Sequence, residues 1–317
     1  MKAAIVRAAG QTPVFADFEE PQPQPGQVLV KVTASAISRL TRARASGQHY
    51  SFNGQYPFVA GVDGVGVLAD GRRVFFAFPA APFGAMAERV AIDLSGCVPV
   101  PEGVDDVTAA ALGNPGMSGW MALRERAGFR RGEVVLINGA TGSSGRMAVQ
   151  IARYLGAGRI IVTGRNPAML EQLQTLGADE AISLTQDEKE LRERFNAVFA
   201  AGVDVVLDYL WGKTAGLLLA SSAMMTDAAR PLRFVNIGSM SGEEIQLPAA
   251  LLRSRATALM GSGLGSVSSE RLMAALGEVL ASAPDGRYQI GTQTAPLADV
   301  ARAWARDTGN QRLVLQI

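Results

Sequence analysis

The stretch Glu133–Asn166, EVVLINGATGSSGRMAVQIARYLGAGRIIVTGRN, decides the fold of this chain of 317 residues. It opens with the apolar run 134–137, which is typical of a buried parallel strand. Small residues fill the turn at 139–145, and apolar residues then recur at helical spacing until Gly156. A second apolar run, 160–163, completes a strand–helix–strand unit. The pattern predicts a glycine-rich turn in the setting that a dinucleotide-binding motif requires.

The predicted turn suits a pyrophosphate. Gly142 has no side chain, so a phosphate can approach its backbone, and Gly145 allows the helix to pack closely on the strand. The helix N-terminus adds unpaired N–H groups and a partial positive charge. Ala140 stands where the dinucleotide fingerprint has another glycine, so the motif is a variant, and a turn that binds nothing is the alternative. The candidate cofactor residues of the turn are Thr141, Gly142, Ser143, Ser144 and Gly145.

The end of the second predicted strand selects between the two nicotinamide dinucleotides. NAD-binding folds commonly place Asp or Glu there to bind the ribose hydroxyls. This chain has Gly164, Arg165 and Asn166 instead, with no acid to repel a 2′-phosphate and a guanidinium suited to bind one. The expected cofactor is therefore NADPH, with these three residues among those that bind it.

Composition excludes several classes of function. Lys and Arg total 30 and Asp and Glu total 29, a balance that gives no reason to expect nucleic acid or an anionic membrane as a partner. The basic run Arg39, Arg42 and Arg44 is expected to be solvated, or to place one guanidinium on a cofactor phosphate. No apolar run reaches the length of a membrane span, and the N-terminus MKAAIVRAAG lacks the layout of a signal peptide. We therefore expect a cytoplasmic protein.

The chain has one cysteine, Cys97, and one histidine, His49. Zinc in proteins is held mostly by sets of three or four Cys and His side chains. A lone cysteine also cannot form an internal disulfide, and the expected role of Cys97 is that of a small buried apolar residue. The sequence therefore predicts no metal site for zinc.

Two halves with different patterns indicate two domains. Residues 1–113 are rich in strand-like runs, Gly and Pro, and predict a folded β domain. A strand predicted at 27–38 is followed by a predicted loop that runs to about 57. From Asn114 onward helical and strand patterns alternate. A helix is predicted over 120–128, and Asn166 and Pro167 are expected to cap and start another. Strands of this half are predicted at 134–138, 160–163, 180–184, 203–208, 232–237 and 256–261. Six such strands describe a doubly wound parallel sheet, an α/β Rossmann fold. Its strand ends at Asp208, Gly238 and Gly261 are expected to rim a ligand crevice.

Together these features resemble the medium-chain dehydrogenase/reductase superfamily, and within it the zinc-free quinone oxidoreductase branch. The likeness runs over nearly the whole chain in the same order, through MKAAIV, PQPQPGQVLVKV, PFVAGVDGVG, GAMAERVAI, ALGNPGMSGWMAL, RRGEVVLINGATGSSG, LGADEAI, APLADVARAW and RLVLQI. The resemblance implies a GroES-like catalytic domain formed by 1–113 and 285–317. It also implies that 114–284 is the Rossmann domain that binds NADPH.

The chain departs from the family patterns at three places. Zinc-dependent members would have Cys near 38 and His near 62, where this chain has Ser38 and Val62. Quinone oxidoreductases often have Asn and Asp three residues apart after the second strand. Here those positions match Ser38 and Thr41, which leaves the range of substrates open. The family's serine-x-lysine pair for the 2′-phosphate is replaced by Gly164-Arg165, which changes the contacts and keeps the positive charge.

The resemblance implies further cofactor residues. Ser118 matches a hydroxyl that contacts the cofactor near its nicotinamide half, and a helix-capping serine is the alternative. In the family, two further segments contact the cofactor, mostly through backbone atoms. The matching residues in this chain are Asn236, Ile237, Gly238, Gly261 and Ser262. Ordinary turn residues are the alternative for these five.

Tyr50, Ser38 and Thr41 are the candidate catalytic residues. Tyr50 follows Ser-Gly-Gln-His, where related reductases have a tyrosine that can donate a proton, and an ordinary surface tyrosine is the alternative. His49 beside it is a weaker candidate. The aromatic residues that could line an apolar substrate pocket, or simply pack, are Phe52, Tyr56, Tyr209 and Trp211.

The expected activity is NADPH-dependent reduction of quinones or α,β-unsaturated carbonyls without zinc. Hydride transfer to an electrophilic carbon leaves charge on the substrate oxygen, which backbone N–H groups or hydroxyls must stabilise. The alternative is a non-catalytic protein that binds NADPH as a sensor or a structural element, because no strong general acid is evident. A zinc-free alcohol dehydrogenase is a weaker third hypothesis, since nothing here polarises an alkoxide. The apolar strand at 256–261 can pair with its own copy at a sheet edge, and the resemblance implies that it does so as in dimers of the family, so the expected assembly is a homodimer.

Overall fold

A computed structural model of the chain describes residues 1–49, 52, 55–227 and 230–317. It divides into unit 1, Met1–Asn114 with Met273–Ile317, and unit 2, Pro115–Leu272. The sequence placed the second boundary at 285, and the structure has it inside helix α8 (Ser269–Gly286). The reason is packing, because Gly277 of this helix lies against Val98 of unit 1.

The sheet of unit 2 has six parallel strands in the order β11-β10-β9-β12-β13-β14. Along the chain this reads 3-2-1-4-5-6, the order of a dinucleotide-binding doubly wound sheet. The strands are β9 (Val134–Asn138), β10 (Arg159–Gly164), β11 (Glu180–Ser183), β12 (Val205–Asp208), β13 (Leu232–Asn236) and β14 (Thr257–Gly261). The predicted fold is confirmed, with each predicted strand present to within two residues at its start.

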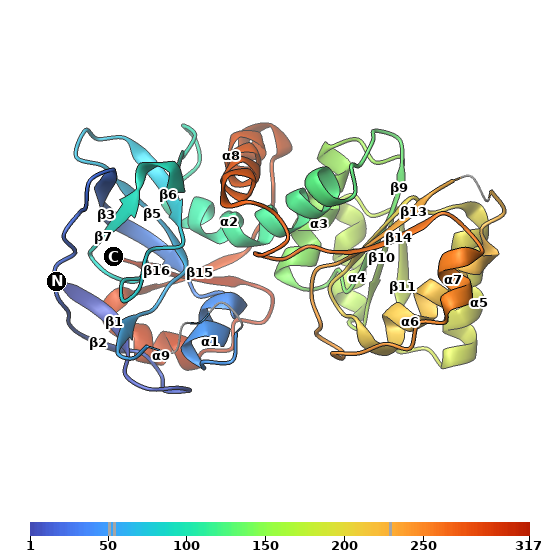
Figure 1. The fold of residues 1–317 in the computed structure, drawn as a ribbon, viewed down its shortest axis with the longest axis horizontal. Coiled ribbons are helices and arrows are strands. Elements are labelled where there is room, and N and C mark those ends of the chain that lie inside the picture. Colours follow the sequence, from blue (N-terminus) through green and yellow to red (C-terminus); the bar gives the residue numbers. More distant parts are fainter. Residues whose placement is uncertain (50–51, 53–54, 228–229) are drawn as a thin grey trace. The chain divides into compact units, whose positions relative to one another are not determined.

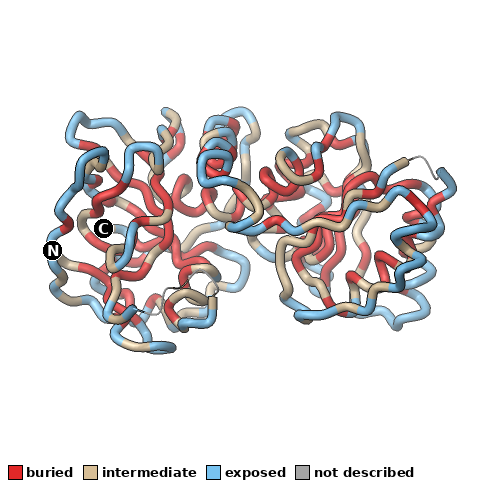
Figure 2. Tube along the Cα trace, viewed as in Figure 1, coloured by how far each residue is buried: buried red, intermediate tan, exposed pale blue. Residues whose placement is uncertain are grey.

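Helices cover both faces of this sheet (Figure 1). They are α3 (Ser143–Tyr154), α4 (Pro167–Thr175), α5 (Glu188–Ala201), α6 (Gly212–Ser221) and α7 (Ala249–Arg253). On one face, Phe195 and Phe199 of α5 and Leu218 of α6 pack with Phe234 of β13 in a fully buried cluster. Figure 2 shows the central strands as buried along their length, as parallel strands with helices on both faces must be.

Local signals explain where these helices start. Asn166 accepts a hydrogen bond from the backbone N–H of Met169, and Pro167 occupies the first position of α4. Asp187 accepts in the same way from Glu190 at the start of α5. Side-chain caps of this kind satisfy N–H groups that the helix itself leaves unpaired, and they contribute about 1 kcal/mol each. The cap predicted at Asn166 is confirmed.

Unit 1 is built on two sheets, a seven-stranded one with β7 as a branch on β3 and a three-stranded one. The chain-terminal strand β16 pairs with β3, so residues far apart in sequence share one sheet. The strands are β1 (Lys2–Val6), β2 (Val14–Asp17), β3 (Gln27–Ala36), β4 (Phe58–Val59), β5 (Asp63–Val67), β6 (Arg73–Ala77), β7 (Arg89–Asp93), β8 (Cys97–Pro99), β15 (Thr292–Pro296) and β16 (Arg312–Gln316).

Three helices lie wholly or partly in unit 1 besides α8. The segment after β3, predicted as a loop, contains helix α1 (Arg39–Ala45), because Ser38 accepts from the backbone N–H of Thr41 and caps it. Helix α2 (Asp106–Met121) starts well before the helix predicted near 120 and continues as a π-helical turn over Ala122–Arg126. Helix α9 (Val300–Ala305) is short. In the described part of the chain, none of the helices has both the length and the apolar character to cross a membrane.

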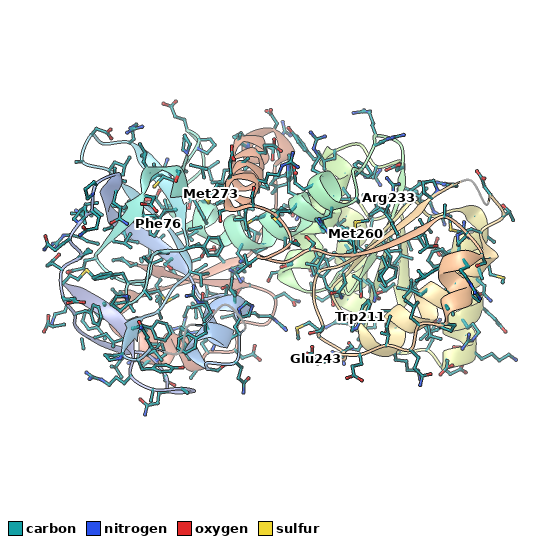
Figure 3. The ribbon with its side chains drawn as sticks, in the orientation of Figure 1. Phe76, Trp211, Arg233, Glu243, Met260 and Met273 are labelled. Carbon is teal, nitrogen blue, oxygen red and sulfur yellow. The ribbon has the colours of Figure 1, made fainter. Side chains whose placement is uncertain are left out.

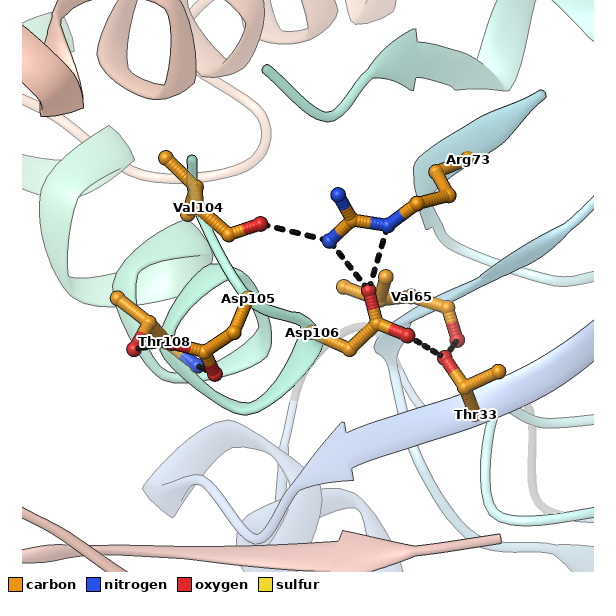
Figure 4. Close-up of polar contacts among 7 residues, drawn as sticks. All are labelled: Thr33, Val65, Arg73, Val104, Asp105, Asp106 and Thr108. Atoms are coloured by element: carbon orange, nitrogen blue, oxygen red, sulfur yellow. Dashed lines mark hydrogen bonds and ion pairs between the residues drawn. The ribbon is translucent and has the colours of Figure 1, made fainter. Parts of the chain in front are cut away.

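A polar cluster holds the start of α2 against the sheet of unit 1 (Figure 4). Arg73 of β6 donates to the Asp106 carboxylate through Nε at 2.9 Å and also to the carbonyl of Val104 at 2.6 Å. The hydroxyl of Thr33 donates to the other Asp106 oxygen at 2.6 Å and lies 3.2 Å from the carbonyl of Val65. One guanidinium therefore connects a strand, a loop and a helix.

We expect Arg73→Gln to destabilise unit 1 and Arg72→Gln to leave it nearly unchanged. Hydrogen bonds to charged groups contribute about 1.5–3 kcal/mol, and Arg73 makes several. Its neighbour Arg72 makes only an exposed pair with Asp70, and such a change costs within about 0.5 kcal/mol. Urea denaturation of both variants measures the difference. Equal midpoints for the two would show that the cluster contributes no stability.

Candidate functional site

The carboxyl ends of four neighbouring strands in unit 2 are joined by one buried polar network. The amide of Asn138, at the end of β9, donates to the Asp208 carboxylate at 2.7 Å. The hydroxyl of Thr163 in β10 donates to the Asn138 oxygen at 2.7 Å and accepts from the backbone N–H of Gly139 at 3.0 Å. Asn236 at the end of β13 reaches Asp208 at 3.5 Å. The network fixes the edge of the sheet from which ligand-binding loops start.

Asp208 is the centre of this network and is fully buried. Burial raises the pKa of its carboxyl above the ordinary value, and the hydrogen bond from Asn138 opposes this shift. The backbone N–H groups of Leu210 and Trp211 also donate to it, at 3.0 and 3.1 Å. Sequence reasoning placed Asp208 at the rim but missed Asn138 and Thr163. The sequence feature that could have identified Asn138 and Thr163 is a polar residue at or near the end of each apolar run.

The glycine-rich turn between β9 and α3 leaves open space where a phosphate is expected. A Cβ added at Gly142 would meet no atom within 4 Å, whereas one at Gly145 would lie 2.5 Å from the Cα of Ala140. Gly145 is therefore required by close packing, and the variant Ala140 is accommodated and fully buried. Gly139 has φ +84°, a backbone conformation that favours glycine.

The N-terminus of α3 has no side-chain cap. Gly142 occupies the cap position in an extended conformation, and no side chain accepts from the first N–H groups of the helix. Ser143 and Ser144 are partly exposed there. A helix of 12 residues with an open, uncapped N-terminus offers backbone donors and a partial positive charge to an anion. The turn therefore fits a dinucleotide pyrophosphate.

The end of β10 carries an exposed positive charge. Arg165 is exposed, and no hydrogen bond or ion pair joins its side chain to another described residue. Gly164 is buried against Thr141 of the turn, where an added Cβ would lie 2.4 Å from the threonine methyl group. Asn166 uses its side-chain oxygen to cap α4. Of the three residues predicted here, Arg165 is the one whose side chain is available to a ligand.

Polar groups that sequence reasoning did not consider lie beside Gly164. Ser183 of β11 is its register partner across the sheet. The Ser183 hydroxyl is 2.8 Å from that of Thr185, and both residues are on the surface. Two hydroxyls next to the arginine add hydrogen-bonding capacity at this corner, and only the strand pairing places them there.

The other cofactor candidates of unit 2 lie at strand ends. Ile237 and Gly238 donate their N–H groups to the carbonyl of Asp208, and Ser262 donates to the carbonyl of Asn236 at 2.8 Å. Gly261 accepts from Arg126 at 2.8 Å. These segments follow β13 and β14 directly, so their backbone is held at the carboxyl edge.

Ser118 lies inside α2 rather than at a helix terminus. Its hydroxyl donates to the carbonyl of Pro115 at 2.9 Å, which satisfies its donor within the helix. The buried hydroxyl of Tyr209 lies beside it, and burial raises the pKa of Tyr209 above its ordinary value. Trp211, labelled in Figure 3, packs edge-on against Phe234 at 6.4 Å between ring centroids, so it belongs to the core of unit 2.

The catalytic candidates Ser38 and Thr41 form a buried hydroxyl pair in unit 1. Their oxygens are 2.9 Å apart, and Ser38 also accepts from the backbone N–H of Thr41 at 3.0 Å. Two hydroxyls that share one hydrogen bond retain one further O–H donor. The third candidate, Tyr50, lies outside the described residues.

A small pocket in unit 1 is lined by Thr41 together with Arg44, Phe52, Phe58, Val62 and Phe83. The rings of Phe52, Tyr56 and Phe58 form a cluster with centroid distances of 5.0, 5.4 and 5.5 Å. The Tyr56 hydroxyl donates to the carbonyl of Ala45, which ties this cluster to α1. Phe52 thus lines the pocket, and Tyr56 packs against Phe52.

Positions 38 and 62, where zinc-dependent relatives would have Cys and His, carry Ser38 and Val62 in this chain. Among the described residues, no three Cys, His, Asp or Glu side chains come together in a way that could hold a metal ion. Burial, and then the charge of Arg44, lower the pKa of His49. Cys97 is half-buried rather than fully buried, and burial raises the pKa of its thiol to about 11.

Comparison with known proteins shows which proteins this chain is similar to. Residues 145–280 match the family model described as zinc-binding dehydrogenase. A probable NADPH-dependent quinone reductase of Emericella nidulans, tdiC, is 29% identical over 99% of both chains. A mycocerosic acid synthase-like polyketide synthase of Mycobacterium tuberculosis is 34% identical over 66% of this chain, which spans 10% of that much longer protein.

A solved structure extends the match to the whole fold. The quinone oxidoreductase of Thermus thermophilus, studied alone and in complex with NADPH, superposes with a TM-score of 0.83 at 29% identity over 100% of both chains. The similarity in fold and the similarity in sequence therefore both extend over the whole chain. These similarities are all consistent with a quinone reductase-like protein of the medium-chain dehydrogenase/reductase superfamily.

Proposed function

We propose that the protein is an NADPH-dependent reductase of quinones or α,β-unsaturated carbonyls that works without zinc. The observation that carries the proposal is the pairing of open space at Gly142 with an unpaired, exposed Arg165 at the end of β10. The first suits a pyrophosphate and the second a 2′-phosphate. The full-length similarity to a probable NADPH-dependent quinone reductase supports the same assignment.

Unit 2 would hold NADPH along its carboxyl edge. The turn residues Thr141, Gly142, Ser143, Ser144 and Gly145 would bind the pyrophosphate, and Arg165 the 2′-phosphate. Backbone at 236–238 and 261–262 would line the rest, with Ser118 near the nicotinamide half. When bound, NADPH supplies the hydride for reduction of the substrate.

Unit 1 would stabilise the negative charge that develops on the substrate oxygen. Ser38 and Thr41 are buried and hydrogen-bonded to each other, so their remaining O–H donor is oriented in advance. A preorganised donor of this kind is worth more in a site that excludes water than it is in solution. The neighbouring Val62 is apolar and cannot bind a metal, which is why hydroxyls carry this role in the proposal.

The alternative is a non-catalytic protein that binds NADPH as a sensor or structural element. Among the described residues, the Ser38–Thr41 hydroxyl pair is the best candidate for a proton donor to the substrate. The described residues that line the pocket include no acidic side chain. Turnover of a simple quinone with NADPH separates the two functions, because a binder would hold NADPH without consuming it. A zinc-free alcohol dehydrogenase is less favoured, since these hydroxyls would not polarise an alkoxide as a metal does.

The proposal includes a homodimer in the cytoplasm. β14 pairs only with β13, which leaves the other edge of β14 unpaired within the described sheet. Its residues Leu259 and Met260, the latter labelled in Figure 3, are apolar and only partly buried. An apolar edge strand can pair with its copy about a twofold axis.

Zinc removal should leave the activity unchanged. The purified protein should hold much less than one zinc per chain, because one Cys and one His cannot supply a Cys/His ligand set. Elemental analysis and assays of NADPH oxidation before and after EDTA check this. About one equivalent of zinc that is needed for turnover would refute the zinc-free assignment.

Arg165→Ala should weaken the binding of NADPH and leave the binding of NADH nearly unchanged. A hydrogen bond to a charged group is worth about 1.5–3 kcal/mol, which corresponds to a loss of roughly 10- to 100-fold in affinity. NADH lacks the 2′-phosphate and serves as the internal control. Fluorescence titration of both cofactors measures the effect. Equal losses for both would mean that Arg165 has a structural role.

Tyr50→Phe should change quinone turnover by less than about tenfold. Hydride addition to a quinone leaves a stabilised oxyanion that water can protonate, whereas an enolate is more basic and gains more from a positioned acid, typically about 10²–10⁴-fold. Oxidation of NADPH by wild type and variant, with a quinone and an enone, measures both. A loss of about a hundredfold with both substrates, while NADPH binding is retained, would contradict protonation by water.

A further inference from the structure

We infer that Arg44 makes the pocket of unit 1 selective for substrates that carry an anionic group, such as a quinone with a sulfonate or carboxylate substituent. The inference rests on the proposed function and adds a substrate class to it. The sequence predicted that the basic run after β3 is solvated or places one guanidinium on a cofactor phosphate, whereas the structure places Arg44 at this pocket.

Helix α1 places Arg44 beside the candidate catalytic hydroxyls. Ser38 caps the helix, and Thr41 and Arg44 follow at a spacing of three residues, so they share one face. Both line the same pocket. The hydroxyl that would contact a substrate oxygen and the guanidinium therefore face one ligand.

The three arginines of this segment have different surroundings. Arg42 donates to the carbonyl of Trp304 and lies over the indole ring, 5.1 Å from its centroid, so its charge has a structural partner. Arg39 is exposed. Arg44 is half-buried, and its buried Nε has no hydrogen-bond acceptor among the described residues. Of the three, Arg44 is therefore the one whose guanidinium is partly buried with no hydrogen-bond acceptor for its Nε among the described residues.

The pocket offers this cation no counter-charge. Its described lining is apolar or aromatic apart from Thr41 and Arg44, and contains no acidic residue. Burial lowers the pKa of Arg44 below its ordinary value, and burial, followed by the charge of Arg44, lowers the pKa of the neighbouring His49. Partly desolvating an unpaired charge costs free energy, and an anionic ligand group would remove that cost through charge-assisted hydrogen bonds.

The aromatic wall suits the other part of such a substrate. Phe52 and Phe58 line the pocket with their ring centroids 5.4 Å apart, and Phe83 lines it as well. Planar quinone rings pack well against aromatic side chains. The cavity itself is small, about 20 Å³, so the anionic substituent would enter it beside the guanidinium, and the flat ring would pack on the phenylalanines at its opening.

The test compares 1,4-naphthoquinone with 1,4-naphthoquinone-2-sulfonate, using the full-length enzyme and NADPH. Arg44→Gln should lower kcat/KM for the sulfonated quinone by about 10- to 100-fold, the loss expected for a hydrogen bond to a charged group. It should lower kcat/KM for the neutral quinone by less than about threefold, because no ion pair is lost there. Comparing variant with wild type for each substrate separately cancels their different intrinsic reactivities.

Two further variants serve as controls. Arg39→Gln removes the same charge from an exposed position of the same helix and should change neither substrate. Arg44→Lys keeps the charge and should retain most of the activity with the sulfonated quinone. Equal losses for both quinones in Arg44→Gln, or an equal effect of Arg39→Gln on the sulfonated one, would overturn the inference.

A binding measurement separates this inference from the proposed function. Calorimetric titration with naphthalene-2-sulfonate and its neutral analogue naphthalene-2-sulfonamide needs no turnover. Wild type should bind the sulfonate more tightly, and Arg44→Gln should lose that preference. If wild type reduces neither quinone, the proposed function fails, and the titration still decides the role of Arg44. Equal binding of the two compounds by wild type would refute the proposed role of Arg44.

Discussion

The buried carboxylate of Asp208 is the interaction on which the nucleotide-binding half of the molecule depends. It accepts hydrogen bonds from Asn138 and from the backbone after β12, and Asn138 is in turn held by Thr163. Leaving a charge in the interior without partners would cost several kcal/mol. The ends of the central strands are therefore tied together, and the loops that would bind the cofactor start from a rigid edge.

The glycine-rich turn that starts from this edge differs from the common fingerprint at one position. Ala140 replaces a glycine and is fully buried, because Gly145 provides the close approach between helix and turn. Gly142 keeps the open side of the turn free of side-chain atoms. Recognition of a phosphate needs space and backbone donors more than it needs a particular residue at each position. Arg165 then adds the charge that would distinguish the phosphorylated dinucleotide.

In the proposed function, unit 1 would stabilise the charge that develops on a substrate without the usual zinc ligands. Ser38 and Thr41 occupy positions at the start of α1 where hydroxyls are held by a cap and by each other. The same short helix separates its positive charges, since Arg42 is bound to Trp304 while Arg44 lies at the pocket. A helix of seven residues thus combines packing, a candidate donor and a candidate selectivity group.

The sequence by itself determined the doubly wound sheet, the start of α4 at Asn166 and the lack of a Cys/His set for zinc, because periodicity, caps and composition are local properties or counts. It missed α1, although Ser38 and its cap are also local, since the segment after β3 was predicted to be a loop. Only the tertiary structure decided the network of Asn138 with Asp208, which are 70 residues apart, and the pairing of β16 with β3. It also decided that Arg44, rather than Arg39 or Arg42, carries the unpaired charge at the pocket. The physical reason is that burial and pairing depend on neighbours brought together by folding, and a linear pattern does not contain them.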